Sequence, residues 1–549
     1  MKFIFCKLLI LFSFYAFTQS IPMDRITDWS NAGCTIGNLY FDVSPNFVSE
    51  GADPTGALPN DAVFEQIKFL NEGKFIQLIV PAGVYKFENT VSIPSNFHLT
   101  GRGADSSNFI FDLDGSNHLI TVLGDLSTDN YVVTENAVIG DTIVYLDSTS
   151  DLLAQEWLKL TVDDSALITS DWAERSVGQI VQIKNIEGNK VTLNSQLRLD
   201  LNVNNNIQAD KLIMKENVVL ENISIERTDE TTNQTSNILL SYATNCKIKC
   251  IESRFCNFSH VTIANCSHIE VSGSYFNDAF NFGGGGKAYG VVLQFTSGDC
   301  LVYDNIFEKL RHSMLLQAGP NGNVISYNYS IDPFWSGTTL PANSAGDIVL
   351  HGNYPFFNLF EGNVCQQIVI DNSHGLNGTR NTFFRNRTEL YGIFMNTDPP
   401  SGGQNFVGNE ITIDGFLLGL YALQGKDHYE FGNNQRGTII PSGTNEISEA
   451  SMYLGQSPPF YQENKNWPPI GPSNNIGEYT NQAQSRFLED RLTACVESNK
   501  PNAVLNNYID QILVHPNPTR DKIIISGEII PKEWAILDLS GTTLCTGIG

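Results

Sequence analysis

The sequence predicts an all-β protein, namely a single-stranded right-handed parallel β-helix with an inserted small β module and a C-terminal β segment. A repeat of about 23 residues runs through the second half of the chain. Only 17% of the 549 residues are charged and 45 are glycine, which favours short strands and polar turns over long helices. Hydrophobic residues make up 41%, so the chain can bury a large core.

The repeat is marked by an asparagine that follows a short apolar strand. The asparagines are Asn305, Asn328, Asn363, Asn386, Asn409 and Asn433, at spacings of 23, 35, 23, 23 and 24. Such a period is typical of one coil of a β-helix, with loops added at a corner. Asparagine suits turns and its amide can bond to the next coil, so we expect a stacked ladder here. Ser253 and Ser274 are expected to hold the same position in earlier coils.

The repeat and the flanking composition divide the chain into regions. The expected regions are a β-helix domain over 21–500, a short helix over 61–71, an inserted module over about 125–212, coils over about 217–434 and a C-terminal cap over about 451–496. Within the cap, Arg486–Val496 is expected to form a helix that covers the last coil, because an open strand edge promotes aggregation. The module is either a plain structural insertion or a wall of a substrate groove.

Residues 1–20 have the pattern of a secretory signal. Lys2 and Lys7 precede the apolar run Leu8–Phe17, and small residues follow at a plausible cleavage point. The run is too short to span a membrane, and no other stretch is long enough. Four clustered cysteines are expected to be small buried residues and not a metal site, since no paired ligand spacing accompanies them. They are Cys246, Cys250, Cys256 and Cys266.

The formal net charge of −26 argues against a nucleic-acid partner, which needs a basic surface. It also weakly disfavours a strongly anionic polymer, unless the binding site is locally basic. Between residues 301 and 390, five basic side chains stand against seven acidic ones, much closer to neutrality than the whole chain. This stretch is therefore the best candidate for a groove.

A second strand of each coil ends in a polar residue. In successive coils this residue is Gln317, His351, Asp371 and Asn396. Because neighbouring strands of a parallel sheet lie ~4.8 Å apart, these side chains should form one column. The residues added between Asn328 and Asn363 would place Trp335 in a loop beside it.

Further chemical groups lie close to this column in sequence. They are His312, Asp347 and His374, together with Arg311, Arg380 and Arg385. Each could alone be a turn or capping residue, but functional groups of solenoids gather along one face. We therefore select His351, Asp371, His374, Asp347 and His312 as candidate catalytic residues. The candidate substrate-binding residues are Gln317, Asn396, Arg311, Arg380, Arg385 and Trp335.

Two reaction types fit these residues. In β-elimination, a base removes the proton beside a uronate carboxylate while a cation stabilises the intermediate, and His351 or His374 could be the base. In glycoside hydrolysis two carboxylates flank the bond, and Asp347 with Asp371 is the natural pair. Histidine suits proton transfer because its reference pKa is ~6.5.

The N-terminal block resembles the pectate-lyase-like β-helix superfamily. The resemblance lies in the GADPTG stretch at 51–56, the VPAGVYKF stretch at 80–87 and the LTGRG stretch at 99–103. It implies the fold and an action on polysaccharide, as a lyase, a hydrolase, an epimerase or a tailspike. The Asp-Asp and Gly-His-Gly motifs of polygalacturonases and the Arg-x-Pro-x-x-Arg motif of pectate lyases are absent, so the resemblance assigns no catalytic residue.

The tail over 508–549 resembles the C-terminal sorting domain of the type IX secretion system of Bacteroidota. The PNPT motif at 516–519 and the DLSG turn at 538–541 carry this resemblance. The final strands and basic ending usual for that domain do not follow, so part of it is expected here. The resemblance implies the type IX secretion machinery as a partner.

The sequence thus predicts a carbohydrate-active protein, secreted or held at the surface of a Gram-negative bacterium. The leading hypothesis is β-elimination on a uronate-containing glycan. A glycoside hydrolase, a uronate epimerase and a non-catalytic glycan-binding adhesin are the alternatives. No cofactor is predicted and no metal ligand is assigned, although calcium is left open. The expected partner is the polysaccharide, with no nucleic acid and no membrane span.

Overall fold

The computed structural model describes residues 20–37, 40–337, 345–395, 401–461 and 466–495, with the backbone of four strands beyond them. The chain divides into two units, Met1–Val496 and Glu497–Gly549. Apart from Ser20, the predicted signal lies outside the described residues. No helix in the described ranges is long and apolar enough to cross a bilayer.

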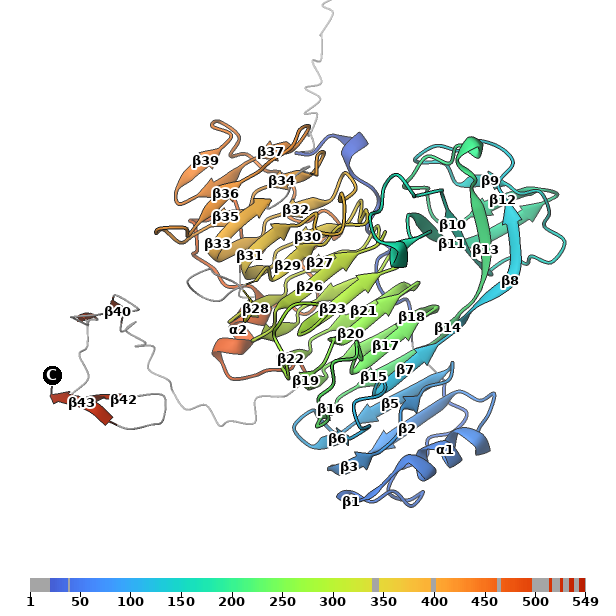
Figure 1. Cartoon of the computed structure of the whole chain (residues 1–549), viewed down its shortest axis with the longest axis horizontal. Helices are drawn as coiled ribbons and strands as arrows, with labels where there is room; N and C mark the ends of the chain where they lie inside the picture. Colours follow the sequence, from blue (N-terminus) through green and yellow to red (C-terminus); the bar gives the residue numbers. More distant parts are fainter. Residues whose placement is uncertain are drawn as a thin grey trace, which may run out of the picture. The chain divides into compact units, whose positions relative to one another are not determined.

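The first unit is a parallel β-helix whose strands form three long parallel arrays, here called sheets 1 to 3 (Figure 1). Sheet 1 has 12 strands, and sheets 2 and 3 are joined into one sheet of 21 strands. Sheet 1 contains β2 (Ile76–Val80), β5 (Phe97–Gly101), β14 (Lys215–Glu216), β15 (Val218–Glu221), β18 (Ala243–Lys249), β21 (Ser267–Ser272), β24 (Leu301–Tyr303), β27 (Val324–Ser326), β30 (Leu359–Glu361), β32 (Thr382–Phe384), β34 (Asn405–Val407) and β37 (Tyr429–Phe431). Sheet 2 contains β1 (Thr55–Pro59), β3 (Gly83–Phe87), β6 (Ser107–Phe111), β16 (Ser224–Arg227), β19 (Glu252–Cys256), β22 (Tyr275–Ala279), β25 (Ile306–Glu308), β28 (Tyr329–Ile331), β35 (Glu410–Ile411), β38 (Asn433–Gln435) and β39 (Thr438–Ile440). Sheet 3 contains β4 (Val91–Ser92), β7 (Ile120–Leu123), β17 (Ile238–Ser241), β20 (Ser259–Ala264), β23 (Tyr289–Gln294), β26 (His312–Gln317), β29 (Ile348–Leu350) and β36 (Leu420–Ala422). Two long strands, β31 (Val364–Ile370) and β33 (Arg387–Met395), bend from sheet 2 into sheet 3.

The core lies between the three sheets and is filled by the side chains that alternate inward along each strand. Phe360, Phe383 and Phe406 occupy one position of successive coils, and their ring centroids stack 4.8 and 5.1 Å apart. These separations match the distance between neighbouring strands. Identical apolar residues in one column therefore pack on each other along the length of the helix.

The predicted amide ladder is confirmed. From Asn305 to Asn433, each asparagine Nδ2 donates to Oδ1 of the next at 2.9–3.1 Å. A second ladder, Asn323–Asn358–Asn381–Gln404, runs along the corner between sheets 3 and 1. Ser274 precedes Asn305 in the first ladder, as expected. The expectation for Ser253 is wrong, because Ser253 pairs with Phe276, two residues beyond Ser274.

The two helices differ in how well the sequence predicted them. Helix α1 (Asp61–Leu70) lies where expected and buries Phe64 and Ile67 against the first coils. We expected a helix over Arg486–Val496 that covers the last coil, and both its position in the sequence and its location on the β-helix are wrong. Helix α2 spans Gln482–Leu488 and packs on the side of the middle coils, where Phe487 meets Tyr329 at 5.3 Å. At the C-terminal end of the β-helix, strand β39 instead folds back antiparallel on β38.

The inserted module is an antiparallel sheet of six strands with its own core. In sheet order they are β8 (Asp125–Val132), β13 (Gln208–Ile213), β10 (Trp157–Thr161), β11 (Gly178–Glu187), β12 (Lys190–Leu193) and β9 (Ile143–Tyr145). Three short 3-10 turns complete the first unit: η1 (Met23–Arg25), η2 (Asp171–Ala173) and η3 (Val203–Asn205). In Figure 1 the module, in cyan and green, stands beside the stacked coils.

Two extended segments run back along the outside of the coils. The N-terminal strap, residues 20–37 and 40–46, follows the corner between sheets 3 and 1, and the C-terminal strap, residues 441–461 and 466–495, follows the corner between sheets 1 and 2. The N-terminal strap bonds in order to Glu449, Asn405, Phe357, Asp299, Asn245 and Phe75. The C-terminal strap bonds in order to Glu361, Glu410, Asn328 and Asp304, and ends at a disulfide between Cys495 and Cys250. Cys250 is thus bonded, whereas Cys246, Cys256 and Cys266 are free and buried, as expected.

The straps decide which outer face of the coils is left open. Ile21 and Trp29 of the N-terminal strap cover apolar residues of sheet 1, and Ile470 and Ala483 of the C-terminal strap cover those of sheet 2. Within the described ranges, neither strap covers the outer face of sheet 3.

The second unit holds two antiparallel strand pairs. These are β40 (Leu513–His515) with β41 (Ile524–Ser526), and β42 (Glu533–Leu537) with β43 (Thr543–Ile548).

We predict that Asn363→Ala lowers the free energy of unfolding by about 2–5 kcal/mol, because it leaves the buried Ile325 carbonyl and Asn328 N–H without partners. Urea denaturation followed by circular dichroism measures the change. Asn204→Ala, at an exposed turn of the module, is the control and should change stability by less than about 0.5 kcal/mol. Equal stability of both variants would contradict a structural role for the ladder.

Candidate active site

A groove of about 780 Å³ lies on the outer face of sheet 3. Residues of β17, β20, β23 and β26 line it, and it ends at the turns that follow β29 and β31. Its lining comprises His118, Trp172, Gln234, Ser236, Leu239, Ser241, Phe258, Thr262, Ala264, Asn265, Gly285, Gly286, Tyr289, Gln294, Phe295, Arg311, Gln317, His351, Ser373 and His374. Among the residues that the structure describes, this lining contains three histidines and one arginine but neither aspartate nor glutamate. In a chain of net charge −26, the described lining of the groove thus holds one guanidinium, that of Arg311, and no carboxylate.

The inserted module forms one side of the groove. Trp172 packs edge-on against Phe295 at 5.9 Å and against His374 at 5.8 Å. The module is anchored there, because Thr296 Oγ1 donates to the Ser176 carbonyl at 2.6 Å. An added Cβ at Gly319 would approach that carbonyl to 1.9 Å, so the close contact requires glycine. The module is therefore a groove wall, the second of the two roles that its sequence left open.

Arg311 forms part of the opposite side. Its Nη1 donates to the carbonyls of Gly283 and Gly285, and its guanidinium lies between Tyr289 and Trp335, 5.7 and 5.1 Å from their ring centroids. No carboxylate is paired with Arg311 among the described side chains. Arg311 can therefore offer its charge to an anionic ligand.

The predicted column exists where the chain is described. Leu316, Leu350 and Ile370 are paired in register, so Gln317, His351 and Asp371 follow one another on neighbouring coils. Gln317 Nε2 extends the column backwards by donating to Gln294 Oε1 at 2.9 Å. Asn396, the predicted next member, lies outside the described residues.

His351 and Asp371 form an ion pair, with Nδ1 and Oδ2 2.7 Å apart. Asp371 also accepts hydrogen bonds from the backbone N–H and the hydroxyl of Ser373, at 2.8 and 2.9 Å. Burial acts to raise the pKa of Asp371, but His351 and Ser373 outweigh it and hold the pKa at about 2. Asp371 is thus ionised at neutral pH, and its carboxylate faces Nδ1 of His351.

His374 stands beside this pair. Its ring centroid lies 4.8 Å from that of His351, and its Nδ1 is 3.4 Å from the Ser170 hydroxyl of the module. Burial, followed by the neighbouring His351, lowers the pKa of His374 below its usual value. Two neighbouring histidines with different surroundings are a typical arrangement for an acid and a base.

His312 lies behind the groove and does not line it. It is 7% exposed, and its ring is 5.8 Å from that of His351. Its Nδ1 contacts the Gly346 carbonyl at 2.8 Å, so this nitrogen carries the proton. Burial lowers the pKa of His312 far below the usual value, so the ring is neutral. His312 can support His351 but does not reach a ligand.

The structure separates Asp347 from the groove, against our expectation. Asp347 is fully buried and accepts hydrogen bonds from Ser330 and from the backbone N–H groups of Gln366 and Gln367. Burial raises its pKa to about 7. It lies close to the column in sequence, but its side chain turns into the protein and joins β28 to β31.

Two of the predicted arginines also lie outside the groove. Arg385 is buried and donates to the carbonyls of Glu449 and Ile470, so it holds the C-terminal strap. Arg380 packs over Phe357 at 5.2 Å, near the corner that leads into sheet 1. Trp335 supports Arg311 and does not itself line the groove. Within the described ranges, no group of three or more His, Cys, Asp or Glu side chains is arranged to hold a metal ion.

No protein family matches the sequence, and no curated protein matches it. Among solved structures, the tailspike protein gp49 of Pseudomonas phage LKA1 is similar over 67% of this chain and 64% of the tailspike, with a TM-score of 0.52 and 15% identity. This chain thus spans slightly less than two thirds of the tailspike. The exopolygalacturonase of Thermotoga maritima matches 74% of this chain and 94% of its own, with a TM-score of 0.38 and 10% identity. The likeness to the tailspike shows the parallel β-helix fold alone.

We predict that His374 titrates below pH 6.5 and that His351→Gln raises its pKa, because the variant removes the neighbouring positive charge. Nuclear magnetic resonance of ¹³C-labelled histidine measures both values, with His374→Ala to assign the signal. His98→Ala, on sheet 1, should leave the signal unchanged. A pKa of His374 at or above 6.5 would contradict the influence of burial and of His351 on this side chain.

Proposed function

We propose that this protein cleaves a uronate-containing polysaccharide by β-elimination in the groove of sheet 3. The observation that carries the proposal is the neighbouring pair His351 and His374, with Asp371 bonded to His351, at one end of a groove whose described lining has no carboxylate. Such a groove suits a polymer that brings its own negative charges. The outer face of the coils is long enough for several sugar units, because each coil adds ~4.8 Å.

The proposed reaction transfers two protons, one from the sugar to His374 and one from His351 to the leaving oxygen, and it breaks one carbon–hydrogen and one carbon–oxygen bond. His374, which is neutral at pH 7, takes the proton from the carbon beside the uronate carboxylate. The electron pair left behind forms a double bond to the neighbouring carbon, and the glycosidic carbon–oxygen bond breaks. His351, paired with Asp371, gives a proton to the departing oxygen. Neither water nor an oxidant is consumed.

Arg311 supplies the positive charge that this reaction needs. Removing the proton spreads negative charge onto the uronate carboxylate, and a fixed guanidinium stabilises that charge. The bonds from Arg311 to Gly283 and Gly285 hold the guanidinium in place before the substrate binds. The proposal assigns no cofactor, since Arg311 fills the role that a cation such as calcium would otherwise take.

Glycoside hydrolysis is less well supported. It requires two carboxyl groups facing the same bond. Asp371 is engaged by His351 and Ser373, and Asp347, its predicted partner, is fully buried. The described part of the groove thus offers no second carboxylate.

The proposed setting is extracellular. Residues 1–20 would direct export, and residues 508–549, as part of a sorting domain, would be recognised by the type IX secretion machinery of a Gram-negative member of the Bacteroidota. The protein would then act in the medium or at the cell surface.

We predict that His374→Ala and His351→Ala each lower kcat/KM by about a hundredfold to ten-thousandfold, the usual share of general acid–base catalysis. The assay follows the ultraviolet absorbance of unsaturated uronates, together with reducing ends, on polygalacturonate, alginate and neutral polysaccharides. His98→Ala is the matched control and should retain activity.

Each other outcome of this assay points to a different function. Reducing ends without unsaturated products would indicate a hydrolase and overturn the elimination. Retained glycan binding without any product would indicate an adhesin. A changed uronate composition without cleavage would indicate an epimerase.

We predict that Arg311→Gln raises KM for the acidic substrate by about 10- to 100-fold, because a hydrogen bond between charged groups contributes roughly 1.5–3 kcal/mol. Arg311→Lys keeps the charge but not the two-pronged geometry, so it should fall between the wild type and Arg311→Gln. Steady-state kinetics at fixed ionic strength measure the series. Equal KM for all three proteins would show that the carboxylate binds elsewhere.

A further inference from the structure

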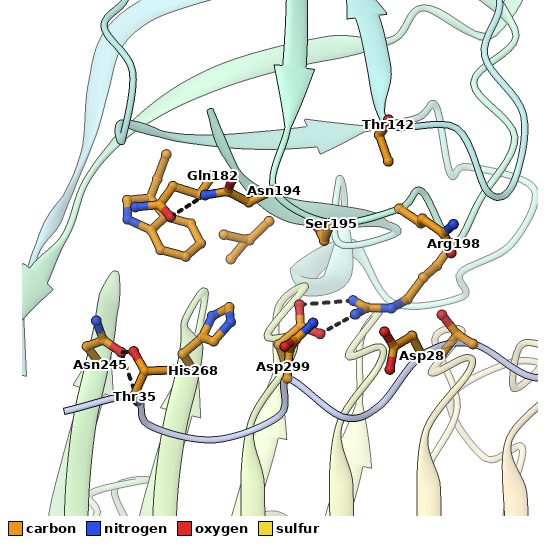
Figure 2. Close-up of a pocket in the computed structure, with 15 residues that line it drawn as sticks. Asp28, Thr35, Thr142, Gln182, Asn194, Ser195, Arg198, Asn245, His268 and Asp299 are labelled. Carbon is orange, nitrogen blue, oxygen red and sulfur yellow. Dashed lines mark hydrogen bonds and ion pairs between the residues drawn. The ribbon is translucent and has the colours of Figure 1, made fainter. Parts of the chain in front are cut away.

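A second cavity, of about 500 Å³, lies where the inserted module, the coils and the N-terminal strap meet. Figure 2 shows Gln182, Asn194 and Ser195 of the module on one side and Asn245, His268 and Asp299 of the coils on the other. Thr35 and Asp28 of the strap run along its edge. We call this cavity the cleft. It shares no lining residue with the groove.

The coil side of the cleft is a column of polar side chains. Cys246, Ile269 and Cys300 occupy one position of three successive coils, so the residues before them are aligned as well. These are Asn245, His268 and Asp299, all with left-handed backbone angles of 50–56°. They form a row of polar groups at ~4.8 Å intervals, set by the strand spacing.

The module side adds amides and an indole. Trp157 packs edge-on against His268 at 5.7 Å. Asn194 Nδ2 donates to Gln182 Oε1 at 2.7 Å, which fixes both amides. In the described structure, neither Trp157 Nε1 nor His268 Nε2 has a hydrogen-bond partner, and neither is sealed from solvent. These ring nitrogens and the amides can therefore bond to a ligand.

The charges of the cleft differ from those of the groove. Arg198 forms an ion pair with Asp299, and its Nη1 also donates to Asn321 at 3.1 Å, so its charge is already compensated. Asp28 is exposed at the edge and adds negative charge. Burial lowers the pKa of His268, which is therefore neutral at pH 7. Among the described residues the cleft offers no free cation to a carboxylate. Thr35 occupies Asn245 Oδ1 and Gln155 takes Gln182 Nε2, but Asn245 Nδ2 and Asn194 Oδ1 remain to bond to hydroxyls, together with the two ring nitrogens.

We propose that the cleft is a second glycan-binding site, which holds a neutral, hydroxyl-rich sugar segment between the module and the coils. Amides bond to hydroxyl groups as donors and acceptors, and the edge of Trp157 packs against the apolar face of a sugar ring. A volume of about 500 Å³ lies within the range of small-ligand sites. The site does not depend on the reaction proposed for the groove.

The test is affinity electrophoresis of the full chain carrying His351→Ala, which prevents cleavage. Native gels contain barley β-glucan, galactomannan, polygalacturonate or alginate. We expect retardation by at least one neutral polymer, and the double variant Gln182→Ala/Asn194→Ala should weaken it about tenfold or more. Asn185→Ala, an exposed amide on the same strand β11 but outside the cleft, is the matched control.

A second variant tests the cleft by filling it, so the result does not depend on whether the alanine substitutions lower the stability of the module. Ser195→Trp would fill the cleft and should abolish retardation by the neutral polymer while leaving that by the acidic polymers intact. If no neutral polymer retards the protein, or if the cleft variants migrate like the control, the proposal is wrong. If Arg311→Gln abolishes only the retardation by the acidic polymers, that result concerns the groove, and continued retardation by the neutral polymer supports the separate site in the cleft.

Discussion

The stacking of each coil on the next by backbone hydrogen bonds, with an amide ladder at the corner, is the constraint on which the rest of the structure depends. Each asparagine from Asn305 to Asn433 bonds to its neighbour and to the backbone of the coils beside it, so the coils from Asn305 onward turn at the same place. Because the corners coincide, equivalent residues align in columns. The pairing of His351 with Asp371 follows from this alignment, and the row Asn245–His268–Asp299 follows from the register of the backbone hydrogen bonds between earlier coils.

The period of the sequence was enough to predict the fold and the ladder. It also predicted the Gln317–His351–Asp371 column, because a fixed period and a polar residue at each strand end determine which residues are neighbours. The inserted module was predictable for a similar reason, since its strands are separated by turn residues and interrupt the period. These features depend on local pattern alone.

Side-chain direction could not be read from the same pattern. Asp347 lies four residues before His351, but it precedes the strand and turns inward to bond with Ser330. Arg385 lies beside the ladder, at the corner between sheets 1 and 2, where the C-terminal strap covers it. Trp172 was missed because it lies 202 positions before His374 in the sequence and reaches it only through the docking of the module. Proximity in sequence to a functional column is therefore a weak guide to membership of a site.

The N-terminal strap has a consequence for the order in which the protein folds. Arg25 bonds to Asn405, 380 residues further along the chain, and Ser20 bonds to Glu449. These partners must be in place before the strap can settle, so the residues that are synthesised first complete their contacts last. Contacts at such separations close slowly, because a long loop must be ordered first. Until the late coils form, Ile21 and Trp29 remain uncovered and open to aggregation.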